Sequence, residues 1–111
     1  MIEKIVLKYL EKSLDIPVFM EEPEEPPDTY IIIEKTSGGR EEGLQYATLA
    51  IQSYGKSMQQ AAELNEALKE AMESIDDQDP ISRVELNSDY NFTDTSTKRY
   101  RYQAVYNFIY Y

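Results

Sequence analysis

The sequence lacks two residue types that carry much of enzyme chemistry, because it contains no cysteine and no histidine. Without cysteine there can be no disulfide, no thiolate nucleophile and no cysteine-based metal site. Without histidine, the commonest general base and the commonest transition-metal ligand are missing as well. Any catalysis would have to use carboxylates, lysines, hydroxyls or tyrosines. We therefore predict a protein that is not an enzyme and has no catalytic, cofactor-binding or metal-binding residues.

Long apolar runs and ligand-binding motifs are also missing. No run approaches the roughly 20 apolar residues that a membrane-spanning helix needs, so no membrane contact is expected. The N-terminus, Met1-Ile-Glu-Lys-Ile-Val-Leu-Lys, mixes charged and apolar residues and lacks the continuous apolar segment of a signal peptide. We therefore expect synthesis in the cytoplasm. No Gly-rich phosphate loop, zinc-ligand spacing or nucleophile motif is present.

Positive charge is scarce: 11 Lys and Arg face 21 Asp and Glu, which gives a formal net charge of −10. Tight binding to nucleic acid depends on neutralising phosphates with basic side chains, so such binding is not expected. The acids are densest in the Pro-rich stretch 21–28 and again in 76–79. Both stretches are expected to be solvated, and the second lacks the ligand spacing and the glycine of a calcium loop.

A chain of 111 residues suits a single domain, residues 1–111. Apolar residues at steps of three and four predict helices over 2–14 and 57–75, the second beginning with a capping box at Ser57 and Gln60. The remaining pattern predicts strands over 16–20, 29–35, 44–54, 81–90 and 98–111, with loops at 36–43 and 91–97. The order α-β-β-β-α-β-β indicates an α+β fold. We expect a two-layer sandwich in which two helices cover one face of a mainly antiparallel sheet of about five strands.

Two of these strands carry more apolar and aromatic residues than one covered face requires. Strand 44–54 is apolar on both faces, so either it is central and covered on both sides or its second face meets another subunit. The last strand has aromatic side chains at alternate positions. They either pack beneath the helices or lie partly at a subunit contact, where tyrosine is common. The candidate interface residues are Tyr46, Thr48, Ala50, Tyr100, Tyr102, Tyr106 and Tyr110.

Several segments together carry a family resemblance. They are Pro17-Val18 with the acidic Pro-rich loop and Tyr30–Glu34, then Ala50–Tyr54, Ser57–Leu64, Ser88–Asp94 and Tyr100–Tyr106. With them the chain resembles the small tail terminator (tail completion) proteins of long, non-contractile-tailed bacteriophages, and related head–tail joining proteins. The resemblance spans nearly the whole chain, and its motifs are structural rather than catalytic.

The resemblance implies a structural virion protein that assembles in the host cytoplasm and resides at the head–tail junction. Such proteins form a ring, typically of six subunits, that stacks on the tail tube, stops its polymerisation and offers a surface to the head connector. The implied partners are further copies of the chain, the tail-tube protein and the connector protein. Genomic DNA would pass through the ring without tight binding. The acids that would line the lumen or face a partner are Glu21, Glu22, Glu24, Glu25, Asp76, Asp77 and Asp79.

Two other interpretations remain open at this point. One is a head-completion or neck protein on the connector side of the same junction. The other belongs to a different class, a small acidic inhibitor that mimics DNA and occupies a basic groove. Scattered acids on helices and loops argue against the second. A closed ring would use heterologous contacts, in which one patch of a subunit meets a different patch of its neighbour.

Overall fold

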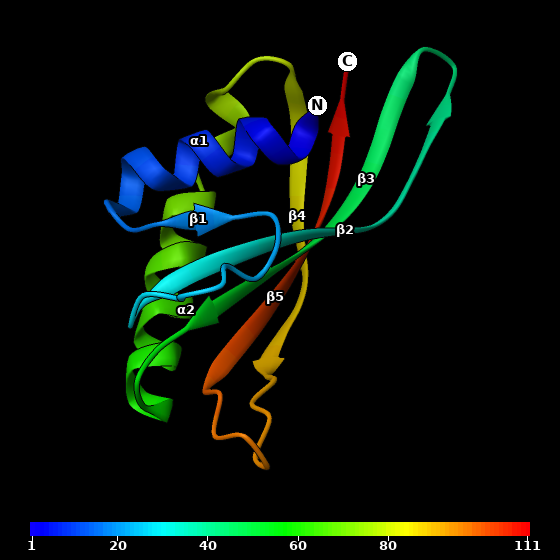
Figure 1. Cartoon of the computed structure of the whole chain (residues 1–111). Helices are drawn as coiled ribbons and strands as arrows, with labels where there is room; N and C mark the ends of the chain where they lie inside the picture. The colour runs from blue at the N-terminus through cyan, green and yellow to red at the C-terminus, as the bar shows by residue number, and fades with distance from the viewer.

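The computed structural model describes residues 1–111 and has the expected α+β architecture. Two helices lie on one side of a five-stranded sheet (Figure 1). In chain order the elements are α1 (Ile2–Leu14), β1 (Val18–Phe19), β2 (Tyr30–Glu41), β3 (Leu44–Tyr54), α2 (Met58–Met72), the 3-10 helix η1 (Ile75–Asp77), β4 (Ile81–Asn91) and β5 (Arg101–Tyr110). The predicted order α-β-β-β-α-β-β is thus confirmed.

The strands lie in the spatial order β1-β2-β3-β5-β4. The short β1 pairs with β2 in parallel, and all the other neighbours are antiparallel. β3 is the central strand, held between β2 and β5 along nearly its whole length. This position pairs both edges of β3, and its residues Ala47, Leu49 and Ile51 face the core, whereas no helix covers its other face.

The hydrophobic core lies between the helices and one face of the sheet. α1 contributes Ile2, Val6 and Leu10, which are fully buried at four-residue steps. α2 contributes Ala61, Leu68 and Met72 from the predicted apolar stripe. Each fully buried aliphatic side chain of this kind contributes roughly 1.5–3 kcal/mol of transfer free energy. The two helices therefore stabilise the fold through tertiary packing rather than through intrinsic helicity.

The start of α2 follows the predicted capping pattern. The Ser57 hydroxyl accepts a hydrogen bond from the Gln60 backbone N–H at 3.1 Å. The Gln60 side chain reaches back one residue further than in the usual box, since it accepts from the Lys56 N–H at 3.0 Å. The helix is shorter at its C-terminus than the predicted 57–75. α2 ends at Met72, and a separate 3-10 turn begins at Ile75.

The prediction of a loop over 36–43 is wrong. β2 continues to Glu41, and the connection to β3 is the two-residue turn Glu42-Gly43, with φ angles of 50° and 82°. Positive φ at both positions matches the right-handed twist of a tight hairpin. Gly38 and Gly39, which fall within the predicted loop, lie inside β2 and pair with Ala47 and Tyr46 respectively. The region is therefore a hairpin arm with one irregularity in its pairing, between Lys35 and Ser37, and its tip lies beyond the helices in Figure 1.

Other boundaries differ by a few residues. The expected strand 16–20 is reduced to two paired residues, and β5 begins at Arg101 rather than at 98. The connection expected over 91–97 runs from Phe92 to Tyr100, where a bridge between Asp94 and Arg99 narrows the loop. Residues 98–100, which were predicted to begin the last strand, thus belong to this loop.

Candidate functional site: the open face of the sheet

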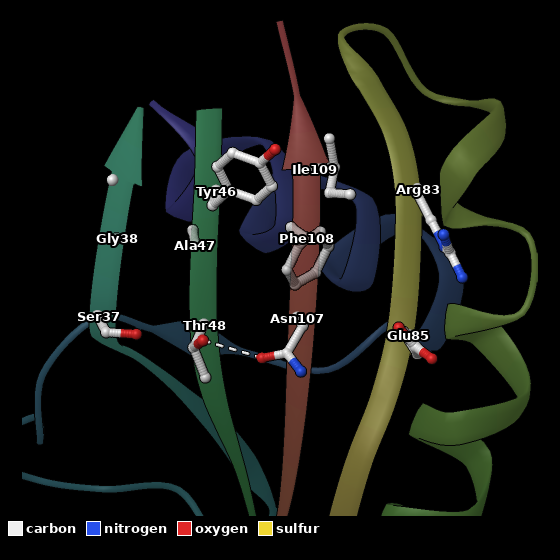
Figure 2. A pocket seen from close by; sticks show the side chains of 11 residues that line it. Ser37, Gly38, Tyr46, Ala47, Thr48, Arg83, Glu85, Asn107, Phe108 and Ile109 are labelled. Atoms are coloured by element: carbon white, nitrogen blue, oxygen red, sulfur yellow. Dashed lines mark hydrogen bonds between the residues drawn. The ribbon is translucent and has the colours of Figure 1, made fainter. Parts of the chain in front are cut away.

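The face of the sheet opposite the helices has no layer over it. Because side chains alternate along each strand, β3 presents Tyr46 and Thr48 on this face. β5 presents Asn107 and Ile109 beside them, since Thr48 pairs with Asn107 and Tyr46 with Ile109. Figure 2 shows these four side chains on the side of the sheet away from the helices. We call this surface the open face.

A shallow hollow of about 450 Å³ lies on the open face and draws on four strands. β2 contributes Ser37 and Gly39, and the outer strand β4 contributes Arg83 and Glu85. Gly39 pairs with Tyr46, and a Cβ atom built on Gly39 would meet nothing within 4 Å. The glycine therefore leaves the surface open at this position.

The polar groups of the hollow are one hydrogen-bonded pair and two charged side chains. The Thr48 hydroxyl donates a hydrogen bond to the Asn107 side-chain oxygen at 2.9 Å, which joins the two central strands (Figure 2). Arg83 and Glu85 are exposed and take part in none of the four ion pairs of the chain. Tyr46 is 37% exposed. The hollow can thus offer an aromatic ring, aliphatic surface and one charge of each sign to a partner.

The other end of the open face is closed by an aromatic cluster. The rings of Tyr30 and Tyr54 stack with their centroids 4.5 Å apart and an interplanar angle of 6°. The Tyr30 hydroxyl donates to the Glu22 carboxylate at 2.7 Å and accepts from the Arg99 guanidinium at 2.8 Å. Arg99 also forms an ion pair with Glu22. Burial, and then the hydrogen bond to Glu22, raise the pKa of Tyr30 to about 12.

A chain of amides continues from this cluster across the sheet. The Tyr54 hydroxyl donates to the Gln52 side chain at 3.1 Å, and Gln52 donates to Gln103 at 2.8 Å. Gln103 donates in turn to the Tyr90 hydroxyl at 2.5 Å. These bonds allow Gln52 and Gln103 to be buried without an overlying helix, because their polar atoms have partners. The hollow around Tyr46 is an accessible part of the open face.

The structure divides the predicted interface residues between the two faces. Tyr46 and Thr48 lie on the open face, and Ala50 lies there too but is only 3% exposed. Tyr106 and Tyr110 lie under the helices and are 4% and 8% exposed, so their assignment to a subunit contact is corrected. Tyr102, which pairs with the buried Ser53 on the helix side, and Tyr100, which precedes β5, are half-buried.

Sequence reasoning missed Arg83, Asn107 and Ile109 as members of the same surface. The alternation of aromatic residues in the last strand sets Asn107 and Ile109 on its other face, but it does not show that this face continues the one that carries Tyr46 and Thr48. That information lies in the strand order, in which β5 is inserted between β3 and β4. Only the two-sided apolar pattern of strand 44–54 pointed to a central position for β3.

The predicted acidic residues belong to two separate connections. Glu21, Glu24 and Glu25 are exposed between β1 and β2, where Glu22 is held by Arg99 and Tyr30. Asp76, Asp77 and Asp79 are exposed between α2 and β4. Neither set brings three carboxylates together in an arrangement that could hold a metal ion.

Neither helix combines the length and the apolar character that crossing a membrane requires. No protein-family model matches the chain, and no curated protein matches it significantly.

Proposed function

We propose that the protein is a structural subunit of a bacteriophage tail. In this proposal it forms a ring that caps the tail tube, ends its polymerisation and provides the joining surface for the head. The open face around Tyr46 is the surface with which it contacts another tail protein. The family resemblance suggests the biological setting, and the physical character of the open face supports a protein-binding role.

The observation that carries this proposal is the shortage of charge in the hollow of a very acidic protein. The chain has 21 acidic side chains, but the hollow contains only one of them, Glu85, and Arg83 lies on the same strand and face. The rest of the lining is aromatic, aliphatic, small or hydrogen-bonding. Protein interfaces are depleted of charged residues at their centres and enriched in tyrosine and arginine. The composition of the hollow fits such a centre.

The hairpin arm supports the same conclusion. The molecule measures 44 × 25 × 24 Å along its principal axes, and its hairpin tip lies beyond the helices (Figure 1). The arm is fixed by pairing from Tyr30 to Glu41 with β3, and by the tight turn at Glu42-Gly43. A surface that is ordered before it binds loses little conformational entropy on binding. Leu44 and Tyr46 are thus presented by a strand that is paired along its length with β2, which replaces the loop predicted over 36–43.

The distribution of acids disfavours the DNA-mimic alternative. A mimic of DNA needs carboxylates spread over one face in place of phosphates, because the groove that it occupies neutralises phosphates. Here most of the exposed acids lie on α1, on α2 and in the connections, and only a few, such as Glu34 and Glu85, lie on the strands of the open face. A net charge of −10 is nevertheless compatible with a conduit to which DNA should not adhere.

The proposal can be tested by binding to tail tubes polymerised from the tail-tube protein of the same phage. We expect wild-type protein to co-sediment with the tubes, and Tyr46→Arg to lose this binding while keeping its fold. A matched control is Tyr111→Arg, because Tyr111 is 69% exposed and lines a different depression beside Met1. If Tyr46→Arg binds as well as the control, the open face is not the docking surface. Binding of the wild type to the connector protein alone would favour the neck-protein alternative.

A further inference from the structure

A groove of about 730 Å³ lies between α2 and the outer strand β4, on the helix side of the sheet. Its charged lining consists of four carboxylates and one base: Glu66, Glu70, Glu73, Asp76 and Lys69. Lys69 is already engaged by Glu66 at 2.8 Å and by Asp89 at 3.3 Å. The other three carboxylates take part in none of the ion pairs of the chain. We call this surface the acidic groove, because its negative charge exceeds what its ion pairs neutralise.

The floor of the acidic groove holds a hydroxyl without a partner. Tyr106 lines the groove from β5, where it pairs with Leu86 of β4, and it is only 4% exposed. Its hydroxyl makes no hydrogen bond within the chain. Burial, and then the negative charges of Asp89 and Glu73, raise the pKa of Tyr106 to about 12, so this hydroxyl lies in the field of carboxylates. Buried polar groups nearly always have a partner. The partner that suits this field is a cationic donor, such as an ammonium N–H, from which the hydroxyl oxygen can accept.

The apolar part of the lining is a narrow strip. Val84 and Leu86 contribute to it from β4, and Met72 contributes from α2. Leu86 is 42% exposed, so the strip is accessible. The carboxylates at positions 66, 70 and 73 extend over about two turns of α2, which is roughly 10 Å along the helix axis. They form no cluster that could hold a metal ion. A ligand that contacts all of them must therefore carry positive charges spaced along an apolar chain.

We propose that the acidic groove binds a free polyamine, an aliphatic chain with several ammonium groups. Its methylene groups would lie on Val84 and Leu86, and its ammonium groups would donate to the carboxylates of α2 and to the Tyr106 hydroxyl. The groove does not resemble the centre of a protein interface, because such centres are depleted of Glu and Asp. Bound polyamine would also lower the net charge of −10, which weakens the repulsion between copies. This inference goes beyond the proposed function and does not depend on it.

Titration of the full chain with spermidine at low ionic strength tests the proposal. We expect calorimetry to show saturable binding that is tighter than that of magnesium at the same ionic strength, because a compact ion cannot span the separated carboxylates. In NMR spectra of the complex, we expect NOE contacts between the spermidine methylenes and the methyl groups of Val84 and Leu86. Binding should weaken as salt is added, since partly exposed charges are screened.

Matched variants locate the site. Glu70→Gln with Glu73→Gln should weaken spermidine binding at least about fivefold, the loss expected for two partly exposed ion pairs. Glu24→Gln with Glu25→Gln is the control, because it removes the same charge from exposed residues between β1 and β2 and should leave the affinity unchanged. Tyr106→Phe should weaken binding by about threefold, since the ammonium loses one acceptor. Circular dichroism of each variant confirms the fold.

Three results would overturn the inference. The first is spermidine binding that is no tighter than that of magnesium, which would indicate a diffuse ion atmosphere only. The second is a loss of affinity in the control pair as large as the loss in the groove pair. The third is a trilysine peptide that binds more tightly than spermidine, which would assign the groove to lysine side chains of a partner protein. Tyr46→Arg should bind spermidine like the wild type, so the outcome is independent of tail-tube binding.

Discussion

Tyr106 and Tyr46 form a matched pair for testing which tyrosines stabilise the fold. Tyr106 is 4% exposed in the core, and its ring centroid lies 6.4 Å from that of Phe108. A tyrosine buries roughly 200 Å², which at about 25 cal/mol per Å² gives about 5 kcal/mol as an upper bound. Removing large aromatic side chains from cores costs about 3–5 kcal/mol in practice. We therefore expect Tyr106→Ala to lower the free energy of unfolding by about 3–5 kcal/mol.

Tyr46 should behave differently, because it is 37% exposed and its loss leaves no closed cavity. We expect Tyr46→Ala to cost about 1–2 kcal/mol, since only the transfer of the covered part of the ring is lost. A further control is Tyr106→Phe, which removes a hydroxyl that makes no hydrogen bond within the chain and should cost less than about 1 kcal/mol. Urea unfolding followed by circular dichroism measures all three, because the protein has no tryptophan to report on.

Thermal melts provide a second readout of the same pair. One kcal/mol corresponds to roughly 4 °C in a domain of this size, so Tyr106→Ala should lower Tm by about 12–20 °C. The reasoning is refuted if Tyr106→Ala costs less than about 1 kcal/mol, or if Tyr46→Ala costs more than Tyr106→Ala. Either result would return the Tyr106 face of β5 to the surface and reopen its role as a subunit contact.

Two smaller predictions concern pH and the hairpin turn. Burial is the main cause that raises the pKa of both Tyr30 and Tyr106 to about 12, while an unfolded tyrosine titrates near 10. The folded state therefore keeps protons that the unfolded state releases, so stability should be full below pH of about 10 and fall toward pH 12. Tyr106→Phe should show a smaller loss over this window in urea titrations at successive pH values. Separately, Gly43→Ala should lower the free energy of unfolding in urea by about 1 kcal/mol, because φ is 82° at this position. Glu42→Asn should leave the free energy of unfolding unchanged, since asparagine tolerates the left-handed region.

Local patterns were sufficient to predict the elements whose structure depends on local interactions. The bounds of α1 follow from its four-residue apolar steps, and the predicted 2–14 agrees with the structure. The strand 44–54 likewise agrees with β3, because Gly43 fixes its start and Gly55 follows its end. At α2 the hydroxyl of Ser57 caps the helix as expected. In each case the decisive residues are neighbours in the sequence.

The β2–β3 hairpin could not be predicted from local signals, because two glycine-containing sites compete for the turn. Gly38-Gly39 and Glu42-Gly43 both allow positive φ, and the first is the stronger sequence signal. The choice is made by pairing over a distance: extending β2 to Glu41 adds partners for Leu44 through Thr48 and requires an irregularity between Lys35 and Ser37. The energy of those extra pairs is not visible in the turn sequence itself.

The candidate site shows the same division between local and distant information. Period-two alternation grouped Tyr46 with Thr48, and the structure keeps them together on the open face. The same alternation grouped the tyrosines of β5, but it did not say that the helices would cover them. That outcome depends on pairing such as Leu49 with Tyr106, which places both on the helix side. A strand pattern defines two faces, and only the neighbouring strands and helices decide which one is buried.

The composition of the open face predicts how binding there responds to salt. Its hollow has one acid and one base, so binding should depend mainly on shape and apolar area. Contacts that depend on exposed charges are instead screened over about 8 Å at physiological ionic strength. We therefore expect co-sedimentation with tail tubes through Tyr46 to persist at high salt, and a steep loss of binding with added salt would contradict a docking surface of this composition.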